Sequence, residues 1–127
     1  MRRYVLSPLA ERDVAEVLAW SEAQFRAPSR RRYERLLATA LRDLASDPDR
    51  PGSRSRPEIA PGARTYHLRF SRDRARGDDG PVRRPRHLLL YRVLADGSVE
   101  VGRVIHDARE LHRHLPPDYR SGEGGDE

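Results

Sequence analysis

Histidine and arginine side chains in the second half of the chain could carry acid–base chemistry or hold an anion. His67, His87 and His106 are the candidates to move a proton near neutral pH. RNA cleavage without a metal needs a base, a cation that stabilises the phosphorane, and an acid. Basic candidates for the cation are Arg64, Arg69, Arg92 and Arg103, and His106, at a predicted strand end beside Asp107, is the most interesting acid–base candidate. The alternative for His106 is that it caps a following helix or binds a sheet edge.

The arginines of this region also have interpretations that involve no catalysis. Arg92 follows an apolar run, so we expect its guanidinium to pair with a carboxylate or carbonyl near the core. Arg103 has either that structural role or a role in binding phosphate. We expect Arg64 and Arg69 to be exposed on an outer strand, where they either contact a partner's carboxylates or remain solvated.

A basic helical face and one aromatic side chain are candidates for binding a partner. Arg31 and Arg35 lie on the polar face of a predicted helix, and Trp20 lies off the apolar stripe of the helix before it. An acidic protein or nucleic acid could meet this surface, and we favour the protein. Phe25 and Tyr33 have the spacing of core positions. The partner-binding candidates are Trp20, Arg31, Arg35, Arg64, Arg69, Arg103 and Arg109.

Several other kinds of site are excluded or not expected. The chain has no cysteine, which excludes disulfides, thiolate metal ligands and a cysteine nucleophile. His112 and His114 could join His106 at a metal, but residues two apart on a helix face different directions, so we expect no metal. There is no glycine-rich phosphate loop, Ser-His-Asp set or nucleotide-binding fingerprint, and we expect no cofactor.

Length and composition predict one small, basic, folded domain. The chain has 127 residues, 35% of them charged, and a formal net charge of +5, with arginine at every one of its 25 lysine-or-arginine positions. No apolar run approaches the ~18 residues that span a bilayer. The basic start breaks at Pro8, too early for a secretory signal. We therefore expect a cytoplasmic protein without membrane association, whose positive charge favours an acidic partner.

Two helices are predicted after a short strand at the start of the chain. Residues 4–6 are β-leaning, and Ser7 with Pro8 is typical of a helix cap followed by a first-turn proline. Apolar residues then recur at helical spacing up to Pro28, which we expect to end or interrupt the first helix. The second helix, over 29–46, has a cleaner apolar stripe of Tyr33, Leu36, Leu37, Ala40, Leu41 and Leu44. The short connection predicts an antiparallel helix hairpin.

Three strands are predicted after a loop over residues 46–62. Residues 63–70 alternate between apolar and polar, which predicts a half-buried strand. Residues 87–93 are continuously apolar, as a central strand covered on both faces would be. The Asp-Gly pair at 96–97 predicts a hairpin into the last strand, over 98–106.

These elements predict an α+β fold of order β-α-α-β-β-β. The N-terminal helix hairpin packs on a small antiparallel sheet, and a short C-terminal helix over 108–115 closes the domain. We expect a single domain over 1–115 and a disordered tail over 116–127. Residues 71–86 are a charged inserted loop between two strands, which we expect to be mobile and to add almost no core.

Five short motifs occur in order along this scaffold. They are Leu6-Ser7-Pro8-Leu9-Ala10, Tyr33 at the start of the second helix, Pro61-Gly62 with Arg64, Leu90-Tyr91-Arg92-Val93, and Arg103-Val104-Ile105-His106 followed by Arg109. Together, over about residues 4–115, they resemble the ParE branch of the RelE/ParE superfamily, the toxins of bacterial type II toxin–antitoxin modules. The sequence departs from that branch at 71–86, where the typical link is a few residues. It also lacks the aromatic residue that the ribonuclease branch usually has after His106.

The resemblance implies a toxin held inactive by a small, acidic, co-encoded antitoxin, whose C-terminal segment wraps the helix hairpin and sheet in a hetero-oligomer. It also implies that the toxin binds a protein target, DNA gyrase in the ParE branch, and is not an enzyme. Two alternatives remain open, because a fold does not choose a function. One is a ribosome-dependent mRNA endoribonuclease of the RelE type that uses Arg64, Arg92 and His106. The other is a non-toxic relic that retains antitoxin binding.

Overall fold

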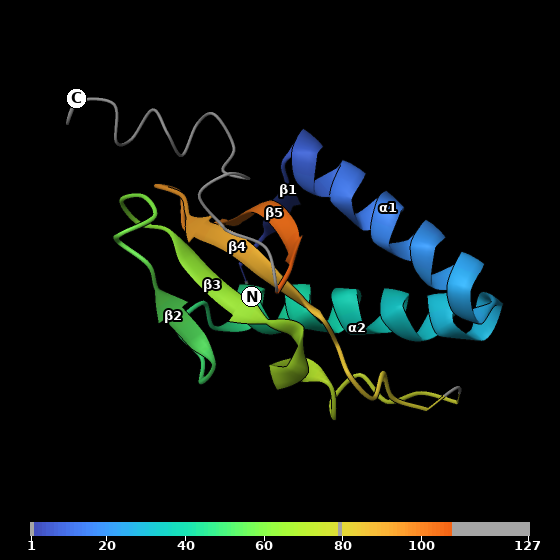
Figure 1. Cartoon of the computed structure of the whole chain (residues 1–127). Coiled ribbons are helices and arrows are strands. Elements are labelled where there is room, and N and C mark those ends of the chain that lie inside the picture. Colours follow the sequence, from blue (N-terminus) through green and yellow to red (C-terminus); the bar gives the residue numbers. More distant parts are fainter. Residues whose placement is uncertain (1, 79, 108–127) are drawn as a thin grey trace.

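The computed structural model describes residues 2–78 and 80–107 of the chain (Figure 1). The elements in chain order are β1 (Tyr4–Leu6), α1 (Pro8–Phe25), α2 (Ala27–Ser46), β2 (Ser53–Ser55), β3 (Arg64–His67), the 3-10 helix η1 (Leu68–Ser71), β4 (His87–Val93) and β5 (Val99–His106). The α+β class and the two-helix hairpin are confirmed. The predicted helix over 108–115 and the predicted tail over 116–127 lie outside the described residues.

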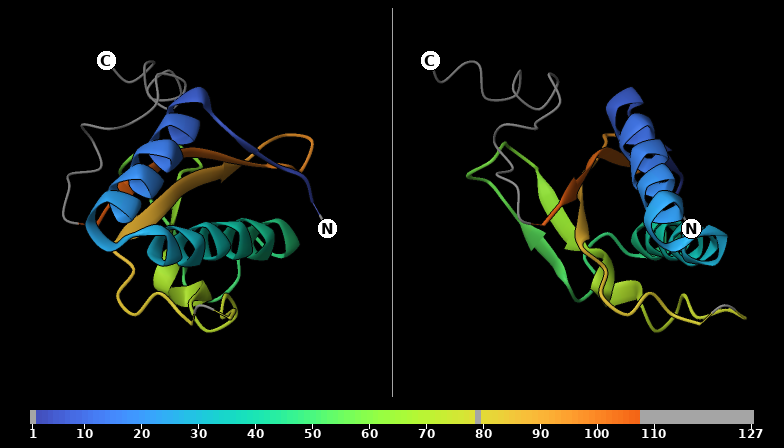
Figure 2. Two further views of the ribbon diagram at one scale, coloured as in Figure 1. Left: turned by 90° about the vertical axis from the view of Figure 1, so that its right-hand side faces the viewer. Right: turned by 45° about the vertical axis from the view of Figure 1, so that its right-hand side comes forward.

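The five strands form one mixed sheet in the order β1-β5-β4-β3-β2. Strands β2 to β5 are antiparallel neighbours, and β1 is parallel to β5. The prediction of an antiparallel sheet is therefore wrong at the β1 edge, because β1 joins the outer side of β5 in the same direction. Strand β2 lies inside the predicted loop over 46–62, and its polar residues show no apolar alternation that could have revealed it. Both helices lie on one face of this sheet (Figure 2).

Helix α1 begins as the sequence predicts, and its cap also ties it to the sheet. The Ser7 hydroxyl accepts a hydrogen bond from the Ala10 amide at 3.0 Å, and Pro8 occupies the first turn. The same hydroxyl donates to the Gly102 carbonyl at 2.7 Å, while the Ser7 amide donates to the Val101 carbonyl at 2.9 Å. One serine therefore caps the helix and fixes its start against β5.

The two helices are joined by a single residue, Arg26. Its φ of 79° lies in the left-handed region, a conformation that costs a non-glycine residue about 1–3 kcal/mol. The prediction that Pro28 ends or interrupts the first helix is wrong, because α1 already ends at Phe25 and Pro28 lies in the first turn of α2. A proline fits a first turn because its missing N–H has no helical partner. The Ser21 and Ser29 hydroxyls meet at 2.7 Å across the junction and hold the two helix ends together.

The main core lies between the sheet and the apolar stripe of α2. Every residue of the predicted stripe is buried: Tyr33, Leu36, Leu37, Ala40, Leu41 and Leu44. A second cluster covers the opposite face of the sheet, where Leu90 packs with Ile59, Ala60 and Ala63. Leu89 and Leu90 point to opposite faces of β4 and are both fully buried, which confirms that this strand is covered on both sides.

A β-bulge at Gly102 reverses which face the end of β5 presents to the helices. Leu90 pairs with Arg103 and Tyr91 with Val101, so Gly102 has no partner in β4. Side chains alternate along a strand, and one extra residue moves all later side chains to the other face. Val101 before the bulge and Val104 after it consequently both join the helix-side core.

The predicted strand over 63–70 is shorter than expected. It ends at His67, and the chain turns into η1, where the Arg69 amide donates to His67 Nδ1 at 3.1 Å. Tyr66 and Leu68 are fully buried as predicted, but Phe70 is 41% exposed. A side chain–backbone hydrogen bond of this kind competes with strand pairing, and the periodicity of the sequence does not reveal it.

The first residues of the 71–86 segment are part of the fold, so the prediction that it adds almost no core is wrong there. The Ser71 hydroxyl donates to the Asp43 carboxylate at 2.7 Å, and Arg74 Nε donates to the same carboxylate at 2.9 Å. Ala75 is 5% exposed and belongs to the main core. Farther along the segment, the Arg35 guanidinium packs directly on Gly77. Asp43, a buried acceptor on α2, is the anchor that the sequence did not reveal.

Candidate functional site

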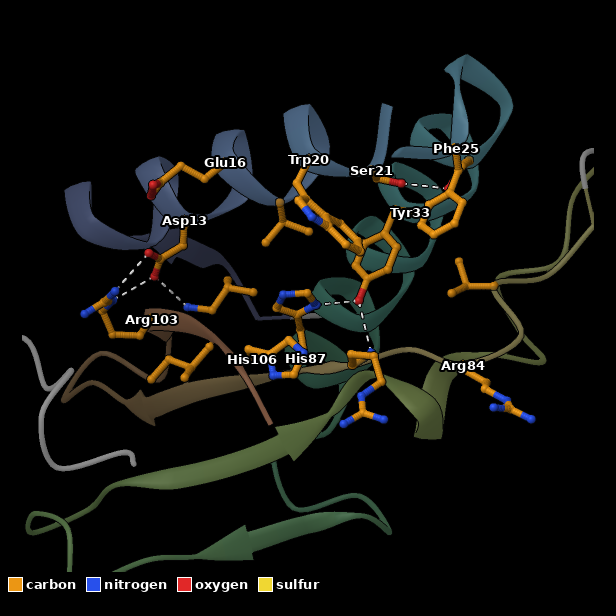
Figure 3. A pocket seen from close by; sticks show the side chains of 16 residues that line it. Asp13, Glu16, Trp20, Ser21, Phe25, Tyr33, Arg84, His87, Arg103 and His106 are labelled. Atoms are coloured by element: carbon orange, nitrogen blue, oxygen red, sulfur yellow. Dashed lines mark hydrogen bonds and ion pairs between the residues drawn. The ribbon is translucent and has the colours of Figure 1, made fainter. Parts of the chain in front are cut away.

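A groove of about 500 Å³ lies between α1, the start of α2 and the ends of β4 and β5. Figure 3 shows side chains from all these elements meeting around it. The chain that leads into β4 closes one side with Val82, Arg84 and Arg86. Within the described residues, no three histidine, aspartate or glutamate side chains are grouped to hold a metal ion. In the same part of the chain no helix has the length and apolar character to cross a membrane.

Two aromatic rings of α1 stand at the mouth of the groove. Trp20 is 54% exposed and Phe25 is 58% exposed, and their rings meet edge to face with centroids 5.7 Å apart. The expected core position of Phe25 is wrong, because this residue ends α1 and has no sheet beneath it. Tyr33 is in the core as expected, with 7% exposure. The groove therefore has an exposed aromatic rim above a buried tyrosine.

The floor of the groove is a chain of polar rings. The Tyr33 hydroxyl lies 2.7 Å from His87 Nδ1 and accepts a hydrogen bond from the Arg86 amide at 3.3 Å. The Tyr33 hydroxyl and His87 Nδ1 therefore share one hydrogen bond, whose direction depends on the tautomer of the His87 ring. Burial raises the pKa of Tyr33 to about 12. The His106 ring meets the His87 ring edge to face, 5.4 Å between centroids.

An ion pair closes one end of the groove. Arg103 makes two hydrogen bonds to the Asp13 carboxylate, 2.7 Å from Nε and 3.0 Å from the terminal nitrogen. Asp13 is 8% exposed, and it also accepts the Val104 amide at 2.9 Å. This bidentate geometry ties α1 to β5 and satisfies both charges, so Arg103 has the structural role that the sequence left open. Arg84 lies at the other end of the groove (Figure 3).

Asp107 organises the strand ends beside the groove. It accepts His67 Nε2 at 3.0 Å and the Arg86 guanidinium at 3.0 Å. Partial burial of the carboxylate acts to raise its pKa, but the His67 hydrogen bond and the Arg86 charge outweigh it and lower the pKa of Asp107. His67 Nδ1 accepts a hydrogen bond from the Arg69 amide, so the ring proton is on Nε2, and Nε2 donates a hydrogen bond to Asp107. His67 and Arg86 are thus held in place by one carboxylate.

The structure does not bring the candidate catalytic set together. Arg64 pairs with Tyr91 near one end of β4, whereas His106 pairs with His87 at the other end. Arg92 is five residues from His87 along β4, about 17 Å of extended strand. Its Nε donates to Glu100 at 2.8 Å, which confirms the expected carboxylate partner. Of the three candidates, only His106 lines the groove.

The remaining arginine candidates lie on several different surfaces. Arg64 is half-buried on β3, inside the sheet, and pairs with Asp49 at 2.5 Å; the prediction of an exposed outer-strand position is wrong because β2 covers that edge. Arg69 lies in η1 with its guanidinium 4.7 Å from the centre of the Phe70 ring. Arg31 and Arg35 are exposed on α2 as expected. Arg109 lies outside the described residues.

Sequence reasoning missed several residues that build the groove. Asp13 is one of them, because its partners come from β5, far away in the sequence. Val82 and Arg84 come from the segment predicted to be a mobile loop. A signal for the bulge did exist: the apolar residues of Val99-Glu100-Val101-Gly102-Arg103-Val104 change from odd to even positions at the glycine.

Comparison with known proteins identifies the family to which the chain belongs. The family model described as the ParE toxin of the type II toxin–antitoxin system matches residues 4–111. Among curated proteins, the chain is similar to Toxin ParE1 of two Mycobacterium tuberculosis strains, CDC 1551/Oshkosh and ATCC 25618/H37Rv. Each is 29% identical over 113 residues, which cover 89% of this chain and 97% of the relative. The chain belongs to the ParE toxin family of type II toxin–antitoxin systems.

Proposed function

We propose that this toxin acts by binding a protein target, DNA gyrase, and that a cognate acidic antitoxin neutralises it by covering the groove. The observation that carries the proposal is the pair of half-exposed rings, Trp20 and Phe25, above an apolar groove. Large aromatic side chains are typical anchors of protein interfaces. The net charge of +5 favours an acidic partner and speeds its encounter with the toxin.

The choice of gyrase rests on the resemblance to the ParE branch, and the groove supports a binding function of this general kind. Three of its charged side chains are paired: Asp13 with Arg103, and Arg86 with Asp107. What the groove offers a partner is therefore apolar surface, together with the charged side chains of Glu16 and Arg84. A neutralised toxin would be one subunit of a cytoplasmic toxin–antitoxin hetero-oligomer.

A second candidate function, mRNA cleavage on the ribosome, is supported by one observation. His106 lies against His87, and the Tyr33 hydroxyl is bonded to that ring, so tertiary contacts supply the aromatic hydroxyl that the sequence after His106 lacks. However, a tyrosine with a pKa of about 12 is a poor base near neutral pH. Arg64 and Arg92 also lie away from this group, so we place this function second.

Growth arrest separates these proposals. The chain is expressed alone and together with the protein encoded by the adjacent open reading frame, and supercoiling by purified gyrase is assayed beside mRNA cleavage on ribosomes. We expect arrest by the chain alone, rescue by the neighbouring protein, and inhibition of supercoiling without mRNA cleavage. A toxin without growth arrest is the relic described above.

The variant His106→Ala distinguishes the ribonuclease proposal from the gyrase proposal most sharply. Trp20→Ala, at the rim of the groove, is the matched variant. We expect Trp20→Ala to weaken rescue by the neighbouring protein and His106→Ala to retain arrest. If His106→Ala abolishes arrest while gyrase stays active throughout, the ribonuclease proposal replaces the gyrase proposal.

A further inference from the structure

A second hollow continues the groove past Phe25. It is lined by Phe25, Ser29, Arg32, Gly80, Pro81, Val82, Arg83 and Arg84. Phe25, Ser29, Val82 and Arg84 line both hollows, so the two form one surface. One wall of the second hollow is α2 with the end of α1, and the other is the stretch 80–84. This second wall comes entirely from the 71–86 segment, which the sequence predicts to be an inserted loop.

The 80–84 wall is held in place from both sides. The Arg72 guanidinium donates to the Arg83 carbonyl at 3.0 Å, so the outgoing and returning halves of the segment are tied together. Val82 packs against the main core, and Pro85 is buried. The Arg86 amide then donates to the Tyr33 hydroxyl. Short-range contacts thus fix the wall against the start of α2, as a formed binding surface requires.

The charges on this wall differ from the paired arginines of the sheet. Arg92 and Arg103 have carboxylate partners there, Glu100 and Asp13. Arg83 and Arg84 are exposed, and within residues 2–78 and 80–107 neither guanidinium forms an ion pair or side-chain hydrogen bond. Two available guanidinium groups therefore flank the apolar surface of Val82 and Phe25. A planar guanidinium binds a carboxylate through two parallel hydrogen bonds.

We propose that the 80–84 wall is a second antitoxin subsite, which takes an acidic stretch with an apolar side chain between its carboxylates. The apolar side chain lies between Phe25 and Val82, and the carboxylates pair with Arg83 and Arg84. The proposal rests on the proposed function, and it makes this segment a determinant of which antitoxin the toxin accepts. Paired charges at the rim of an interface act mainly on association rate and on discrimination between partners.

The test measures association of the toxin with the protein encoded by the adjacent open reading frame, by stopped-flow tryptophan fluorescence at two salt concentrations. The variant is Arg83→Glu with Arg84→Glu. The matched control is Arg2→Glu with Arg3→Glu, an exposed adjacent pair that lines neither hollow and changes the net charge equally. We expect the first pair to slow association about tenfold at low salt and to reduce the salt dependence. The control pair should slow it about twofold or less.

Melting temperatures confirm that each variant is folded, and Arg83→Gln with Arg84→Gln gives a milder change in the same direction. Arginine substitutions at acidic residues of the partner should restore the association rate of the glutamate variant. If wild type binds and the two glutamate pairs have equal rates, the subsite proposal is wrong while the proposed function stands. If the wild-type toxin does not bind the neighbouring protein at all, antitoxin neutralisation fails, and the subsite proposal fails with it.

Discussion

Helix α2 carries a buried polar group near each end, and the two are used differently. Near its C-terminal end, the Asp43 carboxylate accepts Ser71 at 2.7 Å and Arg74 at 2.9 Å, and pairs with Arg50 at 3.1 Å. Near its N-terminal end, the Tyr33 hydroxyl bonds His87 and the Arg86 amide beneath an open groove. In the first cluster, loops cover the carboxylate, and the charges of Arg50 and Arg74 pair with it. The second faces a space that a partner can fill.

This contrast distinguishes structural arginines from those available to a partner. Arg50 and Arg74 converge on one buried carboxylate and hold the 47–52 turn and the start of the 71–86 segment against α2. Arg83 and Arg84, later in that same segment, reach the rim of the groove instead. In a chain with 25 arginines, composition cannot separate these two uses, but the position of buried carboxylates can.

Replacement of Asp43 should have the largest effect on stability. Asp43→Ala leaves the half-buried Arg50 and the buried Ser71 hydroxyl without their acceptor, and breaking such a buried pair costs about 3–5 kcal/mol. Urea unfolding followed by circular dichroism measures the change. The matched control is Asp49→Ala, because Asp49 is largely exposed and pairs with Arg64 at the surface; we expect it to cost less than about 1 kcal/mol. Similar losses for the two variants would remove the distinction between the closed cluster and the surface.

Alkaline pH should act on the groove end through Tyr33. Its pKa is about 12 in the folded protein and about 10 in the unfolded chain, so the unfolded chain releases this proton first as the pH rises. The stabilisation is therefore complete below about pH 10 and is lost between about pH 10 and 12, a change of up to about 2–3 kcal/mol.

Tyr33→Phe should be less stable near neutral pH by about 1 kcal/mol, because His87 Nδ1 loses its hydrogen-bond partner. It should also lose stability less steeply than wild type from about pH 10 to 11. Urea unfolding across this range, with tyrosinate absorbance as a second probe, makes the measurement. Tyr4→Phe controls for removal of a phenol at an exposed position, since Tyr4 is 39% exposed. Parallel curves for wild type and Tyr33→Phe would contradict the prediction.

The rim aromatic should have the smallest effect on stability. Trp20→Ala removes a ring that is 54% exposed, and we expect the free energy of unfolding to change by less than about 1 kcal/mol. If the ring is an anchor, the same variant should lower affinity for the neighbouring protein about tenfold or more. Calorimetric binding and thermal unfolding on one sample make the comparison. A large loss of stability with unchanged affinity would assign Trp20 to the core instead of the interface.

Local sequence patterns predicted much of the scaffold. Ser7 and Pro8 set the start of α1, the stripe from Tyr33 to Leu44 is buried as its spacing requires, and residues 87–93 form the central strand. These features depend on interactions between near neighbours or on burial of one or both faces, and each leaves a trace in the local sequence. β2 and η1 left no such trace. β2 forms by pairing with β3, and η1 begins where the Arg69 amide donates a hydrogen bond to His67.

The sequence by itself determined the class of fold, the family and the positive charge that favours an acidic partner. Only the tertiary structure decided which polar residues are joined: Asp13 with Arg103 across 90 positions, Tyr33 with His87 across 54, and Asp43 with Arg74 across 31. Such pairs depend on how helices and strands are placed in space, and no local period encodes them. The groove and its available arginines follow from that placement, because a charge becomes a binding group only where the fold leaves it without a partner.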